Sequence, residues 1–503
     1  MPIDLTDSGL EAAFTFERER TGVIDEPPFQ ILALGDWSGS GDKKPLSDRR
    51  PVEIDRDNFD QIIARLKTAC DLTFDDGSTL SLTFNSLDDF HPDEIFRRVP
   101  LFEQLRDLRR KLKGEDTFNA AAREVRQMFG TPDDEPAVVA ETAVDEPADN
   151  LLDAILSKPS GGAAAPKPGV SGELNSLISD LVRPHLVSVD ENEQSKLIAA
   201  IDAATSGLMR KILHHRTYQA LEAAWRGLFF LVRRSDTASD LKIFILDVSK
   251  DELSKELRST DNLTDTAIYK HLVKDTIETP GADPWAVVCG NYAFSPVVDD
   301  IAALMRVSKL AEVSGASFVS HMRPDVLGIH SLEQHPEYRD WKFENTTEAG
   351  KLWAALRSQS SSQYLAMAIP RFLVRLPYGA DTDPLETFFF EEFADGPEHD
   401  LYTWANGCFA VTMLLAKSFS AYGWEMGTRL IQDIDGLPVH VYEADGETIF
   451  KPCAEIQMTD VGVDKLMDYG LMPLVSYRAT DRIKLGRFQS IADPVTGLKG
   501  RWS

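Results

Sequence analysis

An acidic segment rich in proline and alanine divides this chain at residues 114–172. It contains DDEP at 133–136, DEP at 145–147 and GGAAAPKP at 161–168. Prolines break helices, and a stretch with so few large apolar residues cannot bury enough surface to form a core. We therefore expect two folded parts, residues 1–113 and 173–503, joined by a disordered acidic linker with an r.m.s. span of about 40 Å.

Composition limits the classes of function. The chain has 503 residues, 43% of them hydrophobic, which allows sizeable cores, and a formal net charge of -28. That charge argues against binding nucleic acid and against an anionic membrane surface; it favours solubility by self-repulsion, with steering towards a basic partner as the alternative. The four cysteines lie far apart in sequence, which is typical of a reducing compartment. Residues 1–4 carry no secretory pattern and no apolar run reaches membrane-spanning length, so we predict a cytoplasmic protein without membrane insertion.

Periodicity predicts α+β or α/β architecture in both parts. In the first part we expect a buried strand at 29–34, a helix at 58–68, a hairpin at 72–84 and a helical run from Pro92. In the second part we expect helices around Leu197 and Trp225 and at 301–313 and 408–419. The strands expected there are 241–248, 285–289 and a pair at 365–376 interrupted at Pro370.

Several motifs invite a chemical interpretation, and each has a simpler one. The loop SGSGDKK at 38–44 lacks the spacing of a phosphate-binding loop, so a strand-exit turn is favoured. The carboxylates at 53–60 have no glycine among them, so a helix cap is favoured over a cation site. The segment DIDG at 433–436 lacks most calcium-loop ligands, and a turn is favoured there.

Histidines do not form a recognisable metal motif. His214 and His215 are adjacent, so on a helix they would point about 100° apart. His321, His330 and His335 are not framed by cysteines or by a carboxylate-rich motif. We predict no catalytic residue, cofactor or metal. The alternative is an enzyme or ligand-binding protein that reuses an α/β scaffold, which would need a pocket of convergent polar groups.

Long, ordered motifs carry a resemblance to a known family. GDWSG at 35–39, VEIDRDNF at 52–59 and NSLDDFHPD at 85–93 resemble the small sheath subunit of bacterial type VI secretion systems (TssB/VipA). Further motifs in the second part resemble the large sheath subunit (TssC/VipB). They are ILHH at 212–215, ALEAAWRGL at 220–228, ILDVSK at 245–250, GNYAF at 290–294, PRFLVRLPYG at 370–379, WANG at 404–407 and GLMPL at 470–474.

The resemblance implies a sheath-subunit fold and a structural function. It implies partners among other sheath subunits or copies of this chain, with inner-tube and baseplate components and an AAA+ unfoldase (ClpV) as further partners. In that family the unfoldase grips a short N-terminal helix of the large subunit. The apolar residues Leu151, Leu152, Ile155 and Leu156 stand where that helix should be, in an expected short helix at 150–157; a stray apolar patch in the linker is the alternative.

Two departures from the family pattern bear on the role. The chain stops at Ser503, before the large subunit's final strands, and residues 11–25 match poorly with the small subunit's N-terminal strand. These departures leave two roles open: a working sheath subunit, or an accessory protein that caps or adapts a sheath.

Overall fold

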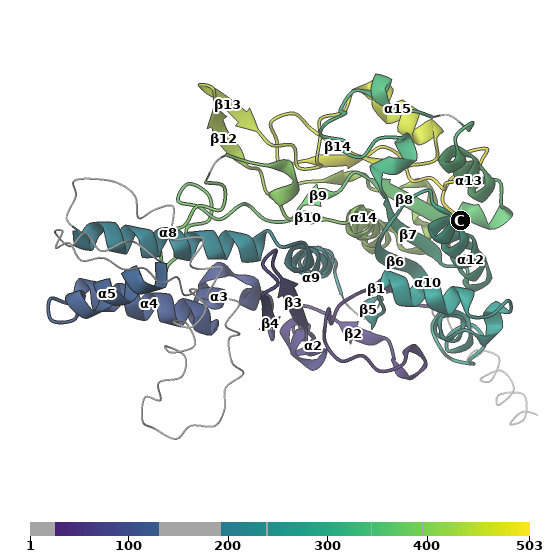
Figure 1. The fold of residues 1–503 in the computed structure, drawn as a ribbon. Helices are drawn as coiled ribbons and strands as arrows, with labels where there is room; N and C mark the ends of the chain where they lie inside the picture. Colours follow the sequence, from purple (N-terminus) through teal and green to yellow (C-terminus); the bar gives the residue numbers. More distant parts are fainter. Residues whose placement is uncertain (1–25, 130–192, 238–239, 344, 395) are drawn as a thin grey trace, which may run out of the picture.

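The computed structural model describes residues 26–129, 193–237, 240–343, 345–394 and 396–503. Its centre is a mixed sheet in the order β11-β15-β14-β8-β7-β6-β1-β5-β2, in which β14, β8, β7, β6, β1 and β5 are parallel neighbours (Figure 1). The strands of this sheet are β1 (Phe29–Gly35), β2 (Val52–Ile54), β5 (Leu241–Asp247), β6 (Trp285–Phe294), β7 (Ser317–Met322), β8 (Leu365–Ile369), β11 (Asp433–Ile434), β14 (Met472–Ser476) and β15 (Ile483–Leu485). The mixed α/β class expected from the sequence is confirmed.

Strand β1 comes from the first part of the chain but lies inside the sheet of the second part. It pairs in parallel with β5 from Phe29↔Leu241 to Gly35↔Asp247, and on its other edge with β6. All of its residues are buried, as a near-continuous apolar run predicts for a strand covered on both faces. The two parts therefore share one sheet, which is a closer union than the packing of one domain on another.

Helices cover both faces of this sheet. Alternate side chains of β1 enter opposite layers: Ile31 belongs to the core cluster that includes α9 and α14, and Leu32 to the cluster that includes α10 and α12. The helices of the described residues are α2 (Phe59–Arg65), α3 (Pro92–Arg98), α4 (Pro100–Lys113), α5 (Phe118–Phe129), α8 (Glu193–Leu213), α9 (Arg216–Arg234), α10 (Lys250–Arg258), α11 (Ala267–Tyr269), α12 (Val298–Ser314), α13 (Glu348–Arg357), α14 (Gly407–Tyr422) and α15 (Asp460–Asp468).

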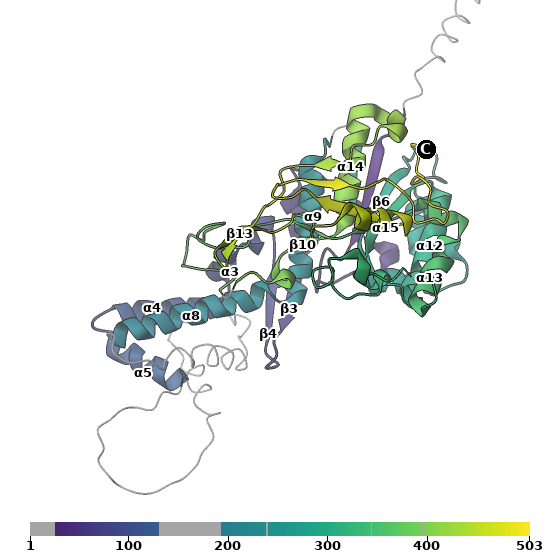
Figure 2. The ribbon, with the colours of Figure 1, turned by 90° about the horizontal axis from the view of Figure 1, so that it is seen from above.

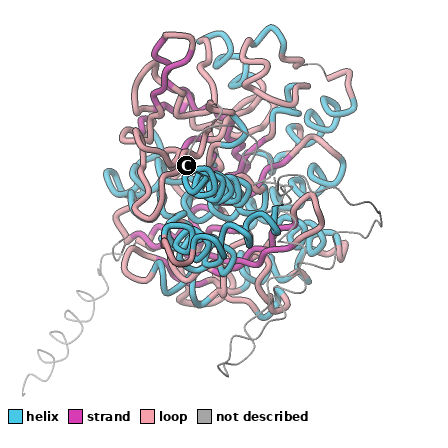
Figure 3. The backbone as a smooth tube through the Cα atoms, turned by 60° about the vertical axis from the view of Figure 1, so that its left-hand side comes forward, coloured by secondary structure: helices cyan, strands magenta, loops and turns pink. Residues whose placement is uncertain are grey.

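Helices α4, α5 and α8 form an arm that extends away from the sheet (Figure 2), and Figure 3 shows these helices in front of the strands of the body. The run expected from Pro92 is split into α3 and α4 at Val99, which is extended because the following Pro100 disfavours the helical conformation there. Helix α5 falls within the segment assigned to the linker by composition, and its Val125 is buried against the bundle.

The remaining strands form small two-stranded sheets. They are β3 (Ala69–Thr73) with β4 (Thr79–Thr83), β9 (Phe372–Leu373) with β10 (Trp404–Ala405), and β12 (Val441–Ala444) with β13 (Glu447–Phe450). The expected hairpin at 72–84 and the interruption at Pro370 are both confirmed. No helix among the described residues has the length and apolar character needed to cross a bilayer.

Candidate functional site

The feature most tied to function is the internal interface, by which we mean the contacts between residues 26–129 and residues 193–503. At its centre Trp37, just after β1, lies 5.5 Å from Trp225 of α9 between ring centroids, and the Trp225 indole donates a hydrogen bond of 3.0 Å to the carbonyl of Trp37. Phe59 meets Trp225 edge-on at 5.7 Å. Gly39 has φ +61° and its Cβ position would be 2.2 Å from the Ala69 carbonyl, so only glycine fits that turn. The GDWSG and AAWRG motifs are therefore the two halves of one buried contact.

A carboxylate at the end of β5 holds the backbone of the turn that follows β1. Asp247 Oδ1 accepts hydrogen bonds from the amides of Trp37 (2.8 Å) and Ser38 (3.2 Å), and Oδ2 accepts one from the Ser38 hydroxyl (2.7 Å). Nearby, Arg49 makes a two-point ion pair with Glu252. Burial would raise the pKa of Glu252, but hydrogen bonds from Arg49 and the Ser249 amide lower it to about 2.

A second set of polar contacts joins the two parts of the chain, at α3, at α9 and within the arm. Asp93, at the start of α3, accepts hydrogen bonds from the amides of Glu386 (3.0 Å) and Thr387 (3.1 Å), and the pKa of Asp93 is lowered because these bonds outweigh its burial. The Tyr218 hydroxyl donates to the Phe90 carbonyl at 2.6 Å. Between α4 and α8, Arg109 Nη2 lies 3.0 Å from Asp202 Oδ2.

A buried charge cluster stands behind the interface, on α9 and the loops after β9. The Arg375 guanidinium binds Glu222 Oε1 at 2.8 Å and Glu392 Oε2 at 2.8 Å, and all three side chains are at most 7% exposed. Arg226 binds Glu222 from one side and the Tyr378 hydroxyl from the other. Burial opposes ionisation, yet the Arg375 charge and its hydrogen bonds lower the pKa of Glu392 to about 2, and burial raises the pKa of Tyr378 to about 12.

A smaller cluster lies near β7. Glu455 binds Arg371 and lies 3.2 Å from His399 Nε2, and the pKa of Glu455 is lowered by Arg371 in spite of burial. His321 of β7 is buried, and desolvation lowers its pKa to about 4. In the first cluster opposite charges pair inside the protein, and in the second the buried Glu455 pairs with Arg371, whose side chain is 40% exposed; this is the arrangement of a structural ion-pair network.

The motifs weighed for ligand chemistry have local structural roles. In the loop 38–44 the amides at its start are occupied by Asp247, and Lys43 pairs with Asp36, so the loop is a strand exit and not a phosphate cradle. Asp55 Oδ1 accepts hydrogen bonds from the amides of Asp57 and Asn58 at 2.9 Å, which closes the turn ahead of α2. The N-cap residue of α2 is Asn58 and no side chain caps the helix, so the cap interpretation is wrong and these carboxylates are turn residues. In 433–436 the carbonyl of Asp435 accepts from Arg234, and Gly436 has a positive φ, as a turn requires.

The structure separates the five histidines. His215 caps α9 by accepting from the Thr217 amide, whereas His214 faces Glu392 at 3.6 Å. His321 is buried, and His330 and His335 are on the surface. Across the described ranges, no group of three or more His, Cys, Asp or Glu side chains is arranged to hold a metal ion. Leu151, Leu152, Ile155 and Leu156 lie outside the described residues.

Sequence reasoning missed the roles of Asp247 and Asp93, whose carboxylates hold backbone amides at the internal interface, and it missed the buried charge cluster. Glu222 and Arg375 are 153 residues apart, so no local spacing relates them. The one available signal was their position: Glu222 stands inside the AAWRG motif and Arg375 inside PRFLVRLPYG. Charged residues in otherwise apolar helical or strand positions are rarely buried unless they are paired.

These observations define the class of protein: a mixed α/β protein built from two interlocked parts, with buried ion pairs inside it. The family model of the EvpB/VC_A0108 tail sheath N-terminal domain (VipB) matches residues 195–492, which is more than half of the chain. The model of the type VI secretion system protein VipA (VC_A0107 or Hcp2) matches residues 13–131. The chain belongs to the VipB tail sheath family and carries a VipA segment ahead of it.

Two relatives from Pseudomonas aeruginosa (strain PAO1) agree with this assignment. The type VI secretion system sheath protein TssC1 is 35% identical over 304 residues, which is 59% of this chain. The sheath protein TssB1 is 27% identical over 124 residues, 23% of this chain and 72% of TssB1. The chain spans 61% of the length of TssC1. The resemblance inferred from the motifs, a fusion of the small and large subunit types, is confirmed.

Proposed function

We propose that this chain is a non-enzymatic structural subunit of a type VI secretion sheath, in which one polypeptide supplies both parts of a protomer. The observation that carries the proposal is the position of β1 between β5 and β6. A central strand paired on both edges cannot be withdrawn without exposing two unpaired strand edges and the apolar layers on either face. The buried, mutually neutralised charges support a structural role, because they are closed to solvent and to substrates.

The linker then acts as a tether that fixes the one-to-one ratio of the two parts. Strand β1 holds the two parts together, because it pairs with β5 and β6 of the second part. To test this, a protease site is inserted at 161–165 and cut after folding. We expect the two fragments to co-elute in size-exclusion chromatography after dilution to nanomolar concentration. Separation of the fragments at micromolar concentration in native buffer would overturn the shared-sheet protomer.

Assembly with other sheath subunits, or with copies of this chain, is the next element of the proposal. We infer that the protein works in the cytoplasm and also meets inner-tube and baseplate components. Electron microscopy of the purified chain alone, and mixed with a full-length TssB–TssC pair, tests it. Tubes from the chain alone would identify a working subunit, and binding confined to the ends of sheaths would identify an accessory role. A chain that stays monomeric and binds no sheath would contradict the function.

The apolar residues Leu151, Leu152, Ile155 and Leu156 are proposed as the handle for an AAA+ unfoldase. An amphipathic turn in an acidic tether has the composition of a groove-binding segment. Replacing Leu152 and Ile155 with Asp should abolish binding to the unfoldase in a pull-down. Val170→Asp, in the same linker, is the matched control. Equal binding by the handle variant and the control would remove this part of the proposal.

A further inference from the structure

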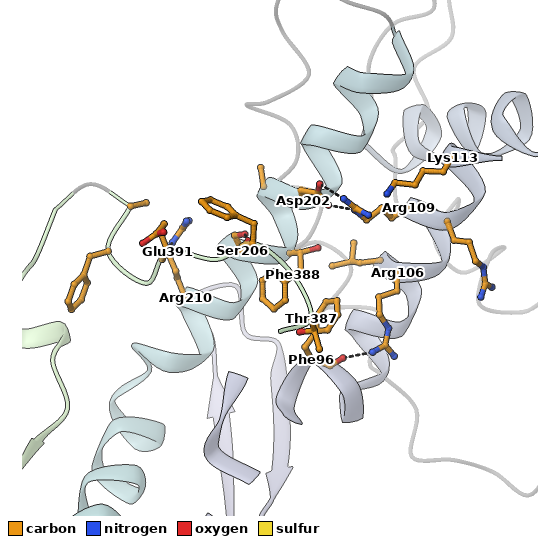
Figure 4. A pocket seen from close by; sticks show the side chains of 17 residues that line it. Phe96, Arg106, Arg109, Lys113, Asp202, Ser206, Arg210, Thr387, Phe388 and Glu391 are labelled. Carbon is orange, nitrogen blue, oxygen red and sulfur yellow. Dashed lines mark hydrogen bonds and ion pairs between the residues drawn. The ribbon is translucent and has the colours of Figure 1, made fainter. Parts of the chain in front are cut away.

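A groove of about 990 Å³ lies on the arm, between α4, α8 and the loop 387–394 (Figure 4). The C-terminal half of α4 forms one wall and the middle of α8 forms the other. Phe388 lies at its base, stacked on Phe96 at 4.5 Å between ring centroids. Phe389, on the same loop, is 79% exposed, which is the largest exposure of any large apolar side chain in the described part of the chain. The groove therefore offers an unpartnered aromatic ring beside polar walls.

The walls are cationic in a protein whose formal net charge is -28. Five basic side chains line the groove: Arg106, Arg109, Arg110, Lys113 and Arg210. The lining carboxylates are Asp202 and Glu391. Asp202 is paired with Arg109, and Glu391 accepts a hydrogen bond from the Ala380 amide at 3.0 Å. A groove with excess positive charge and an exposed ring fits an acidic segment that also carries small apolar side chains.

This chain has such a segment. Residues 133–149 read DDEPAVVAETAVDEPAD and contain seven acidic residues and no Lys or Arg: Asp133, Asp134, Glu135, Glu141, Asp145, Glu146 and Asp149. Between the acidic runs stand AVVA at 137–140 and Val144, which can cover an aromatic ring. We propose that the groove on the arm binds residues 133–149 of the same chain.

The connections at both ends allow this docking. Helix α5 ends at Phe129 and α8 begins at Glu193, and both pack in the same bundle as α4. From Phe129 to the middle of the segment there are 12 residues, which reach about 40 Å when extended. From Glu193 to Asp202, along α8, the distance is about 14 Å at 1.5 Å per residue. Binding within one chain also benefits from a millimolar-scale effective concentration, so weak exposed ion pairs suffice.

The inference is independent of the proposed sheath function. The segment 133–149 ends before the proposed unfoldase handle, so failure of one leaves the other untouched. The docking is a contact inside the arm, whereas assembly and unfoldase binding involve other molecules.

The test uses a full-length chain in which 133–149 is replaced by a Gly/Ser linker of equal length, so that the groove is vacated. A fluorescent synthetic peptide of residues 133–149 is titrated into it and followed by anisotropy. We expect binding that weakens steeply as salt rises, since the contacts are exposed ion pairs. A peptide with every Asp and Glu changed to Asn or Gln should not bind. Failure of the acidic peptide to bind at low salt would overturn the proposal.

Substitutions then locate the site. The double change Arg110→Gln and Lys113→Gln should weaken peptide binding about tenfold or more, because it removes two cations that pair with the acidic segment. Lys111→Gln with Arg123→Gln removes two charges from α4 and α5 outside the groove and is the matched control. Phe389→Ala should weaken binding about threefold or more through the lost apolar contact. Equal losses in the groove variant and its control, with both folded by circular dichroism, would place the peptide elsewhere.

The intact chain provides the last test. Cross-linking Lys113 to the acidic segment with a carboxyl-to-amine reagent, on a mixture of isotopically light and heavy chains, separates links within a chain from links between chains. We expect links within one chain, at a yield independent of protein concentration. Predominant links between chains would overturn docking within the chain and assign the groove to a second copy.

Discussion

The buried charge cluster allows the sharpest test of how this molecule is held together. Arg375 donates to both carboxylates at once, to Glu222 with Nε and Nη2 and to Glu392 with Nη1 and Nη2. Arg375→Met keeps most of the side-chain volume but removes these bonds. The variant leaves Glu222 with Arg226 and leaves Glu392 without its cation, at 1% exposure. Removing one partner of a buried ion pair costs about 3–5 kcal/mol, so we expect a loss of that size at pH 7.

The loss should depend on pH in a direction that the structure determines. In the native protein the folded pKa of Glu392 is about 2, below its unfolded value, so its stabilisation is present above the unfolded pKa and is lost as pH falls towards 2. Without Arg375, burial dominates and the folded pKa of Glu392 rises above the unfolded value. Protonation then favours the folded variant. The difference in stability between variant and native protein should therefore shrink as pH falls from 7 to about 4.5.

The assay is urea unfolding of the full chain, followed by tryptophan fluorescence and far-UV circular dichroism at both pH values. Arg375→Lys keeps the charge but not the two-sided geometry, and should lose less than Arg375→Met. Arg65→Met, on the exposed face of α2, is the surface control and should change stability by less than about 0.5 kcal/mol. A loss below about 1 kcal/mol for Arg375→Met at pH 7, or a loss that does not shrink in acid, would refute the reasoning.

Three further outcomes follow from contacts inside the body. Gly227→Ala should lower stability by about 1–3 kcal/mol in urea unfolding, because its Cβ would lie 2.4 Å from the Phe409 ring. Asp93→Ala should cost about 1–3 kcal/mol and speed hydrogen exchange of the Thr387 amide, while exchange in β1 stays slow. His321 has a folded pKa of about 4, below the ordinary 6.5, so protonation favours the unfolded state and stability should fall by about 3 kcal/mol between pH 6.5 and pH 4. A profile for His321→Gln as steep as that of the native protein would assign the effect to other groups.

Local patterns were sufficient to predict most elements of the fold. The apolar run at 29–34 indicated a buried strand, and the spacing around Leu197 and Trp225 indicated the helices that the structure contains. Such patterns depend on nearest neighbours along the chain, which is why they are visible without a structure. They do not state which strand pairs with which. The placement of β1 between β5 and β6 joins residues about 210 and 255 positions apart, and nothing in 29–34 names those partners.

In the candidate sites, too, turns were visible in the local sequence, whereas contacts between residues far apart in the chain were not. The favoured interpretations of the loop at 38–44 and of the carboxylates near Asp55 were turn and cap. The hydrogen bonds support the turn, whereas Asp55 bonds to amides ahead of α2 and does not cap that helix. Asp247 escaped notice, because an aspartate at the end of a strand looks like an ordinary exit residue until its two amide partners are in place. The helix α5 was overlooked because Gly114 and the acidic residues after it look like the start of a linker, whereas its stability comes from packing on α4 and α8.

The position of β1 also explains what a tether can add to such a protein. A parallel strand needs a long connection to its neighbour, and here both neighbours of β1 come from the second part, with β5 more than 200 residues away. Had the two parts been separate chains, the second would leave β5 and β6 with a gap between them until the first arrived, and open strand edges promote aggregation. A tether shortens that interval, since it raises the local concentration of β1 to about the millimolar range without changing the final contacts. Cutting the linker should therefore leave the folded protein intact but slow refolding of the separated fragments, with a rate that depends on their concentration.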